Sequence, residues 1–160
     1  MLFRSAKRIY QGQLAVLERD PRARKDADAI RHMAAQEDDH FRAFDALMMR
    51  RRIRPTALQP LWHVAGYALG AATALLGQRA AMACTAAVEE AIDTHYAAQT
   101  EKLGEDEAEL KMLIDKARAD ENAHRQEALA RGAEEAAAYP LLSSAIKFGC
   151  RVAIKLSERI

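Results

Sequence analysis

The sequence predicts an all-α protein of one domain, for three reasons. Half of its 160 residues are hydrophobic, yet only 6% are aromatic. Alanine is abundant whereas glycine (7) and proline (4) are scarce, which is typical of long helices and not of β-sandwiches or barrels. Apolar residues recur at helical spacing, and no stretch shows a strand pattern. The length suits a single domain over residues 1–160 with a sizeable core.

The first half of the chain predicts three helices. One over 2–19 places apolar residues among polar ones and stops at Asp20-Pro21. A longer one over 24–51 repeats apolar residues at helical spacing and is closed by an arginine-rich stretch that ends at Pro55. The third, over 58–77, is almost uncharged.

The second half of the chain predicts three more helices. A helix over 79–103 is rich in alanine and is ended by Gly104. Another over 106–131 is ended by Gly132, because glycine favours the position just after a helix. The last helix, over 141–159, is amphipathic.

Charge and cysteine content exclude several classes of function. The 24 basic and 23 acidic residues give a net charge of +1, so the chain is not a polyanion binder and no nucleic-acid partner is expected. Cys84 and Cys150 form no spacing motif, and we expect them to be small core residues in a reducing compartment. The beginning of the chain lacks an apolar run of signal-peptide length, so no export signal is expected.

Two Glu-x-x-His motifs carry the chemistry of this sequence, Glu37 with His40 and Glu121 with His124. Residues three apart lie on one face of a helix, so each motif points a carboxylate and an imidazole the same way. A ferritin-like four-helix bundle builds a di-iron site from two such helices and one glutamate from each of the other two. Carboxylates bridge and neutralise two irons, and imidazole suits iron. One motif alone is equally well explained by a solvated charged face.

The geometry of the second hairpin selects a fifth ligand. In an antiparallel helix pair, residues equidistant from the turn lie at the same level. This hairpin turns near residue 105, and Glu89 and Glu121 lie equally far from that point. Glu89 therefore lies where the bundle needs a glutamate, whereas Glu90 points about 100° further around the helix.

The first hairpin offers no sixth ligand. It turns near residues 21–22, which places Glu37 opposite residues 5–7 and His40 opposite residues 2–4. At those levels the sequence has no Asp or Glu. Five ligands are therefore predicted, and the sixth is absent.

Six stretches of the chain are distinctive when taken together: RIYQGQLAVL (8–17), QEDDHFRAFDALM (36–48), RIRPTALQPLWHVAGYALGAATALLG (52–77), AMACTAAVEEAIDTHY (81–96), RADENAH (118–124) and CRVAIKLSERI (150–160). With them the chain resembles the demethoxyubiquinone hydroxylase family, the di-iron monooxygenases of ubiquinone biosynthesis. The resemblance spans nearly the whole chain. Its part from Arg54 to Glu90 is specific to this family among ferritin-like proteins.

The resemblance implies the same metal ligands as the spacing: Glu37, His40, Glu89, Glu121 and His124. The family's first helix starts with a segment resembling His-Ala-Gly-Glu, and its glutamate falls on Phe3 here. Two explanations stay open, a shortened and re-started form of a longer protein and a true variant. In either case the iron at the open position is expected to bind more weakly.

The resemblance also implies a reaction, its cofactors and its partners. O2 is activated at two ferrous ions per chain, and the ring of a polyprenyl methoxy-benzoquinone, demethoxyubiquinone, is hydroxylated. Two electrons come from NADH, although the sequence has no Gly-x-Gly-x-x-Gly motif. A lipid-binding carrier protein presents the quinone, and a homo-oligomer is an open alternative. The expected location is peripheral to a membrane, at the cytoplasmic face of a bacterial inner membrane or the matrix face of the mitochondrial one.

The segments 58–77 and 141–159 are expected to face a membrane or a partner. The first could span a bilayer by length, but its Gly and Ala content favours a helix that lies on the surface. Trp62 and Tyr67 suit a membrane interface, and the nearby arginines suit anionic lipid. For both segments, ordinary core packing is the alternative.

His95 and Tyr96 match a His-Tyr pair that lies near the metals in the resembled family. A supporting or electron-relay role is one reading, and a hydrogen-bonded position in the bundle is the other.

Two alternative functions concern the whole chain: a metal-deficient relative that binds quinone or scaffolds a biosynthetic complex, and a generic ferritin-like di-iron protein. The absent sixth ligand supports the first, and the apolar stretch 58–77 argues against the second.

Overall fold

The computed structural model describes the backbone of residues 3–159 and the side chains of residues 6–159. Over this range the chain forms α-helices and short 3-10 turns, and it contains no strand. The all-α prediction is therefore confirmed, with helix ends that differ from the expected ones by a few residues. The helices are α1 (Phe3–Leu17), α2 (Arg24–Arg50), α3 (Gln59–Leu75), α4 (Gln78–Thr100), α5 (Ala108–Ala130) and α6 (Tyr139–Ser157).

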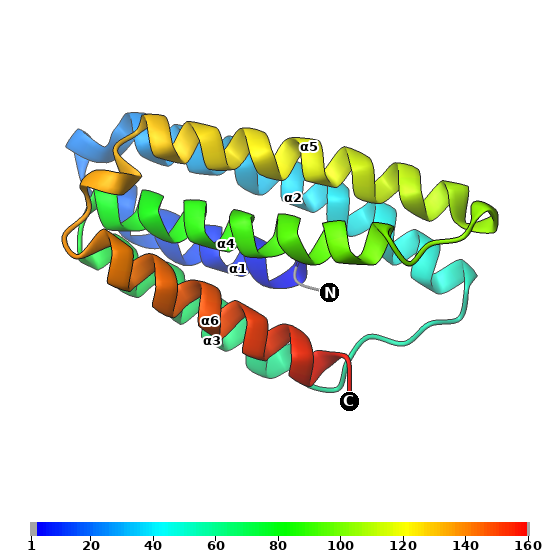
Figure 1. The fold of residues 1–160 in the computed structure, drawn as a ribbon. Coiled ribbons are helices and arrows are strands. Elements are labelled where there is room, and N and C mark those ends of the chain that lie inside the picture. The colour runs from blue at the N-terminus through cyan, green and yellow to red at the C-terminus, as the bar shows by residue number, and fades with distance from the viewer. Residues whose placement is uncertain (1–2, 160) are drawn as a thin grey trace.

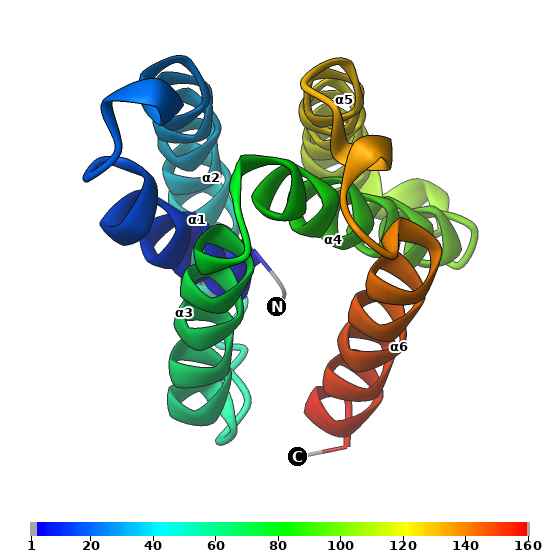
Figure 2. The ribbon, with the colours of Figure 1, turned by 90° about the vertical axis from the view of Figure 1, so that its left-hand side faces the viewer.

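The helices form three layers of two (Figures 1 and 2). Helices α2 and α5 make one outer layer, α1 and α4 the middle layer, and α3 and α6 the other outer layer. Within this arrangement α1 packs against α2 and α3, and α4 packs against α5 and α6. Helices α1, α2, α4 and α5 form a ferritin-like four-helix bundle, which α3 and α6 extend on one side.

Turn residues end the helices as the sequence predicts. The Asp20 side chain accepts a hydrogen bond from the Arg22 backbone N–H and caps the 3-10 turn Pro21–Ala23 that joins α1 to α2. Gly132 has a φ of 85°, the left-handed conformation that a residue just past a helix commonly adopts. One boundary that differs is the end of α4 at Thr100, so that Gly104 caps the next 3-10 turn, Glu105–Glu107, instead of ending the helix.

Two glycines let α3 lie against the backbone of α1. A Cβ atom on Gly12 would overlap the carbonyl oxygen of Tyr67, and one on Gly70 would overlap the carbonyl oxygen of Ile9. Any larger residue at either position would push the two helices apart. This contact fixes α3, and the apolar side chains that it carries, directly beneath the bundle.

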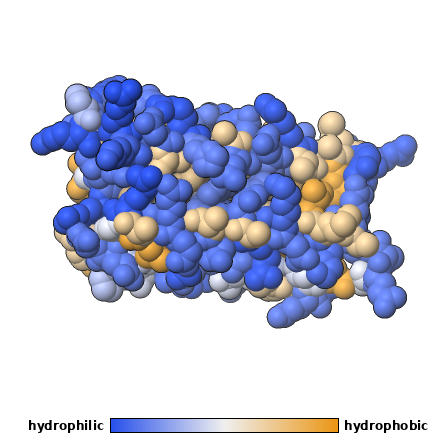
Figure 3. Space-filling model, turned by 90° about the horizontal axis from the view of Figure 1, so that it is seen from above, coloured by the Kyte–Doolittle hydropathy of each residue, from blue (hydrophilic) through white to orange (hydrophobic). Residues whose placement is uncertain are grey.

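The two outer layers differ in polarity. Figure 3 shows the face formed by α2 and α5, where hydrophilic residues predominate. No helix in the described part of the chain is long and apolar enough to cross a membrane. On the other side of the molecule, however, large hydrophobic side chains of α3 and α6 are exposed. These exposed side chains include Leu61, Val64, Leu75, Leu141, Phe148 and Leu156.

Candidate metal centre

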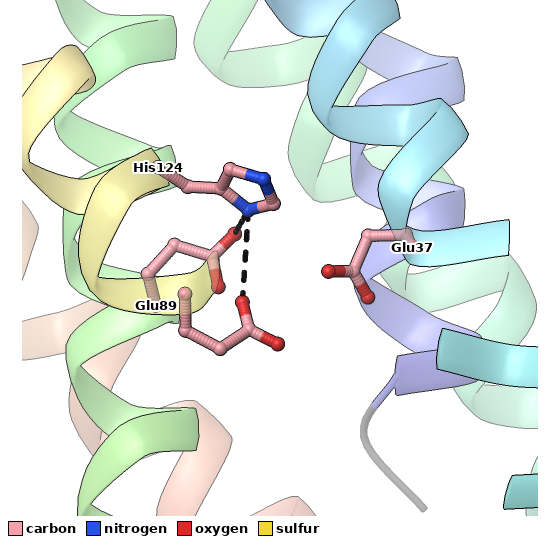
Figure 4. Close-up of side chains that lie close together, drawn as sticks. Glu37, Glu89 and His124 are labelled. Atoms are coloured by element: carbon pink, nitrogen blue, oxygen red, sulfur yellow. Dashed lines mark ion pairs between the residues drawn. The ribbon is translucent and has the colours of Figure 1, made fainter. Parts of the chain in front are cut away.

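Four of the five predicted ligands meet inside the bundle. Glu37 comes from α2, Glu89 from α4, and Glu121 and His124 from α5, and one ligand atom of each lies within 4.8 Å of the others. Figure 4 shows His124 and Glu89 on one side and Glu37 pointing at them from the opposite helix. Side chains far apart in the sequence thus form one carboxylate–histidine metal cluster.

The fifth predicted ligand, His40, lies at the edge of this cluster. Its Nδ1 is 3.4 Å from Oε1 of Glu37 and 3.8 Å from Oε1 of Glu121. On the other side, Nδ1 of His124 is 3.8 Å from Oε1 of Glu89 and also 3.8 Å from Oε2 of Glu121. Glu121 therefore lies between the two imidazoles.

Most polar atoms of the cluster are buried and lack hydrogen-bond partners among the described residues. The five side chains are at most 4% exposed. Both carboxylate oxygens of Glu37 and of Glu121, one oxygen of Glu89 and Nδ1 of both histidines have no hydrogen-bond partner among the described residues. Buried polar atoms are almost always paired, because an unpaired one costs about 1–3 kcal/mol. The donor set therefore fits metal ions, which would satisfy all of these atoms at once.

The raised pKa values of two cluster glutamates also favour a bound cation. Burial raises the pKa of Glu37, and burial together with the nearby negative charge of Glu89 raises the pKa of Glu121 well above its usual value. Several carboxylates crowded into a dry space cannot all remain charged without a cation. Divalent cations at this point would keep them ionised.

Helix α1 contributes a tyrosine to the cluster that the sequence analysis did not identify. The hydroxyl of Tyr10 donates a hydrogen bond to Oε1 of Glu89, and the ring lies edge-on to His124 with centroids 6.4 Å apart. Burial, and then the negative charge of Glu89, raise the pKa of Tyr10 well above 10.0, so the hydroxyl remains a donor. Position 10 lies two turns after position 3 on the same helix face, and this periodicity could have revealed it.

The predicted register of the first hairpin agrees with an observed ion pair. Lys7 of α1 pairs with Asp38 of α2, which places position 7 level with the residue after Glu37. Phe3, the predicted position of the missing ligand, is the first residue of α1, but its side chain lies outside the described part of the chain. Between Ala6 and Leu17, α1 offers the cluster no carboxylate.

The outer nitrogens of both imidazoles contact residues that the sequence analysis also missed. Nε2 of His40 lies 2.8 Å from Oδ2 of Asp120, and Nε2 of His124 lies 2.9 Å from Oε1 of Gln36. Each of these partners directly precedes the glutamate of the other motif. A search for polar residues next to each motif could have found them.

The side chains of His95 and Tyr96, which were predicted as a pair, have different surroundings in the structure. Tyr96 is buried, its ring stacks on Phe44 at 6.0 Å, and burial together with the charges of the cluster glutamates raises its pKa. His95 instead faces α6, where Nδ1 lies 4.0 Å from Oε1 of Glu158. Of the two, Tyr96 is therefore the one whose surroundings include the cluster. Glu90, as expected, points elsewhere and pairs with residues of α5 and α6.

An apolar groove of about 450 Å³ lies between α3 and α6, with α1 and α4 as its floor. Trp62 lines it, and the indole N–H donates a hydrogen bond to Oγ of Ser157 across the groove at 2.8 Å. Tyr67 is exposed on the outer side of α3. The floor residues Ile9 and Val88 directly precede Tyr10 and Glu89, so the groove lies next to the metal cluster.

The bundle and its buried cluster define the class of this protein, a ferritin-like protein with a carboxylate–histidine metal site. Comparison with known proteins then gives the family. The model of the family described as ubiquinone biosynthesis protein COQ7 matches residues 4–157, and the chain belongs to this family.

Named relatives are similar over almost the whole chain. The 3-demethoxyubiquinol 3-hydroxylase of Rhodospirillum rubrum is 57% identical over 97% of this chain and 72% of its own length. The human NADPH-dependent 3-demethoxyubiquinone 3-hydroxylase, mitochondrial, is 50% identical over 97% of the chain and 71% of its own length. The 5-demethoxyubiquinone hydroxylase, mitochondrial, of Saccharomyces cerevisiae is 37% identical over 95% and 71%.

Proposed function

We propose that this protein hydroxylates the ring of demethoxyubiquinone, or of its quinol, in ubiquinone biosynthesis, with two iron ions held by Glu37, His40, Glu89, Glu121 and His124. The observation that carries the proposal is the set of buried carboxylate and imidazole atoms without hydrogen-bond partners. It occurs in a member of a family whose named relatives are demethoxyubiquinone or demethoxyubiquinol hydroxylases.

The side chains divide the work at the centre. Glu89 and His124 would hold one iron and His40 with Glu37 the other, while Glu121 reaches both imidazoles. When bound, the iron pair supplies O2 activation, which no amino-acid side chain provides. Tyr10 orients Glu89 through its hydroxyl, and the surrounding apolar residues exclude water from the reacting atoms.

The apolar groove is the proposed quinone site. Its volume of about 450 Å³ falls within the range of small-molecule sites, and its floor reaches the residues next to Tyr10 and Glu89. A second hollow of about 960 Å³ shares Leu142 and Ala145 with the groove and opens beside Leu75 and Leu141. A quinone ring in the groove would direct its polyprenyl tail toward this second hollow, whose lining is mostly apolar.

The apolar outer side of α3 and α6 is the proposed surface for a membrane or a lipid-binding carrier protein. It contains Tyr67 and the mouth of the second hollow, where a polyprenyl tail would leave. Arg52 and Arg54, in the segment between α2 and α3, are exposed and suit anionic lipid headgroups, whereas Arg50 and Arg51 form ion pairs with Glu109 and Glu107. This surface supports the proposed location peripheral to a bacterial or mitochondrial inner membrane.

The electron source is a reduced nicotinamide nucleotide. The sequence resemblance implies NADH, whereas the human relative is named as NADPH-dependent. An assay with each nucleotide in turn decides between them.

One observation favours a second candidate function, a metal-deficient quinone-binding or scaffolding relative. Between Ala6 and Leu17, α1 supplies a tyrosine and no carboxylate to the cluster. This candidate predicts quinone binding without iron binding and without turnover.

The test is a hydroxylation assay with a short-chain demethoxyubiquinone, Fe(II), O2 and NADH or NADPH. The proposal predicts product in the wild type and its loss in Glu121→Gln. Gly149→Leu, which fills the groove, should raise KM for the quinone without changing iron content, because Gly149 has open space around it. Ser144→Leu, on the exposed face of α6, is the matched control. An iron-loaded wild type that makes no product would refute the proposal.

A further inference from the structure

The two imidazoles of the metal centre are held by a reciprocal pair of contacts between α2 and α5. Asp120, just before Glu121 on α5, contacts His40 of α2, and Gln36, just before Glu37 on α2, contacts His124 of α5. The two residue numbers have the same sum in both pairs, as expected for two antiparallel helices in one register. The two Glu-x-x-His motifs are therefore related by an approximate local two-fold axis.

We infer that Asp120 and Gln36 are positioning residues for the two metal ions, each acting on the ion bound by the histidine it contacts. The inference rests on the proposed function, because it needs metal at the cluster. It adds a role for two residues outside the set of ligands, and it makes the two metal positions chemically different.

The geometry fixes which nitrogen of each ring faces the metal. The Oε1 atom of Gln36 and the carboxylate of Asp120 accept hydrogen bonds, so Nε2 of each imidazole must carry the proton and donate. In a neutral ring, Nδ1 is then the atom with the free lone pair. In both histidines Nδ1 is the buried atom that faces the carboxylates and lacks a hydrogen-bond partner.

The two partners differ in charge, and this breaks the symmetry. Asp120 presents a carboxylate to His40 and is also contacted by Nζ of Lys116 at 3.2 Å, which anchors it on α5. Gln36 presents a neutral amide oxygen to His124. A carboxylate accepts a stronger hydrogen bond than an amide and makes the imidazole a stronger electron donor.

The asymmetry matches a difference between the carboxylates beside the two histidines. Glu89, beside His124, is oriented by the hydroxyl of Tyr10, whereas neither oxygen of Glu37, beside His40, has a hydrogen-bond partner among the described residues. The anionic partner is thus placed behind the histidine whose neighbouring carboxylate has no hydrogen bond to orient it. Loss of Asp120 should therefore weaken that position specifically.

The inference is tested by titrating the metal-free protein with Co²⁺ alone and recording the visible absorption of the bound ion. In the wild type we expect two equivalents of unequal affinity. Asp120→Ala should weaken one equivalent by about 10- to 100-fold and leave the other within about threefold. Gln36→Ala should weaken the other equivalent, and Asp120→Asn, which keeps an acceptor oxygen, should restore part of the loss. Asp115→Asn, which alters an exposed carboxylate that pairs with Lys111 on the same helix, is the matched control and should change neither.

A second readout separates positioning from a merely structural role. The exchangeable Nε2 protons of metal-bound imidazoles give strongly shifted proton resonances in Co²⁺ proteins, and the wild type should show two. Asp120→Ala should lose or shift one of them and Gln36→Ala the other, whereas a general loss of stability would move neither selectively.

Two results would overturn the inference while leaving the proposed function standing. One is unchanged Co²⁺ affinity in both alanine variants, and the other is a loss of the same equivalent in both. A wild type that binds no Co²⁺ would overturn the proposed function, and the inference with it.

Discussion

Replacing Glu121 with Gln should change the stability of the protein in opposite directions with and without metal. Glu121 is fully buried between the two imidazoles, and neither of its carboxylate oxygens has a hydrogen-bond partner among the described residues. The isosteric amide removes one negative charge and can donate to a neighbouring carboxylate. Removing one unpaired buried group is worth about 1–3 kcal/mol, so the metal-free variant should melt roughly 2–12 °C above the metal-free wild type at pH 7.

The pH dependence of the metal-free protein has a defined sign. Folding raises the pKa of Glu121 above 4.5 through burial and the charge of Glu89, so the folded state binds this proton more tightly than the unfolded chain does. The resulting stabilisation is fully present below about pH 4.5 and is lost as the pH rises through the folded-state pKa. Glu121→Gln should abolish this contribution, and its advantage over the wild type should grow toward neutral pH.

Metal reverses the order of the two proteins. An ion present at 100 times its Kd stabilises the folded state by about 2.7 kcal/mol, so two ions should raise the wild-type Tm by roughly 10–20 °C. Glu121 faces both imidazoles, and its loss should remove most of this gain. The assay is thermal unfolding followed by circular dichroism, with and without Co²⁺. A variant that is destabilised without metal, or that retains the full metal-induced shift, would refute the proposal that Glu121 is a buried metal ligand.

The remaining predictions concern α1, the glycine contact and the thiols. Tyr10→Phe leaves Glu89 without its hydroxyl donor and should cost about 1–2 kcal/mol of stability in the metal-free protein, measured by urea unfolding; no change would mean that the hydrogen bond is not formed. Gly70→Ala should lower the free energy of unfolding by about 1–3 kcal/mol, because the new Cβ would overlap the Ile9 carbonyl. The control Gly149→Ala, whose Cβ would have nothing within 4 Å, should leave the stability unchanged or raise it. Equal effects of the two substitutions would contradict the close contact of α1 and α3. Burial raises the pKa of the Cys84 thiol to about 12 and that of the Cys150 thiol to about 11. At pH 8, iodoacetamide should therefore label each thiol at least about 100 times more slowly in the folded protein than in guanidinium, as measured by mass spectrometry. Rapid labelling of Cys84 in the folded protein would show that this thiol is accessible.

The sequence predicted the helices and the level of each candidate metal ligand because both follow from simple periodicities. Apolar residues at helical spacing defined the elements, and equal distances from a turn placed Glu89 opposite Glu121. Register needs only the position of a turn, and the turns were marked by Asp20-Pro21 and by Gly104. The bundle and the meeting of these side chains could therefore be predicted without any contact between distant residues being known.

Other features of the site could not be predicted from the sequence because they depend on how the helices pack against one another. Tyr10 was not singled out because its contact with Glu89 joins two helices that are not neighbours in the chain. Gln36 and Asp120 lie one position away from each motif, and only the interaxial geometry of α2 and α5 decides that they reach across. The direction of His95, toward α6 and Glu158, likewise depends on how α6 packs on α4.

The most direct test of a two-iron centre is an iron count. The metal-free protein is titrated anaerobically with Fe(II), unbound metal is removed, and iron is quantified per chain. The cluster of Glu37, His40, Glu89, Glu121 and His124 predicts two irons per chain in the wild type and fewer than one in Glu121→Gln. A wild type that retains no iron, or a Glu121→Gln protein that retains two, would contradict the account.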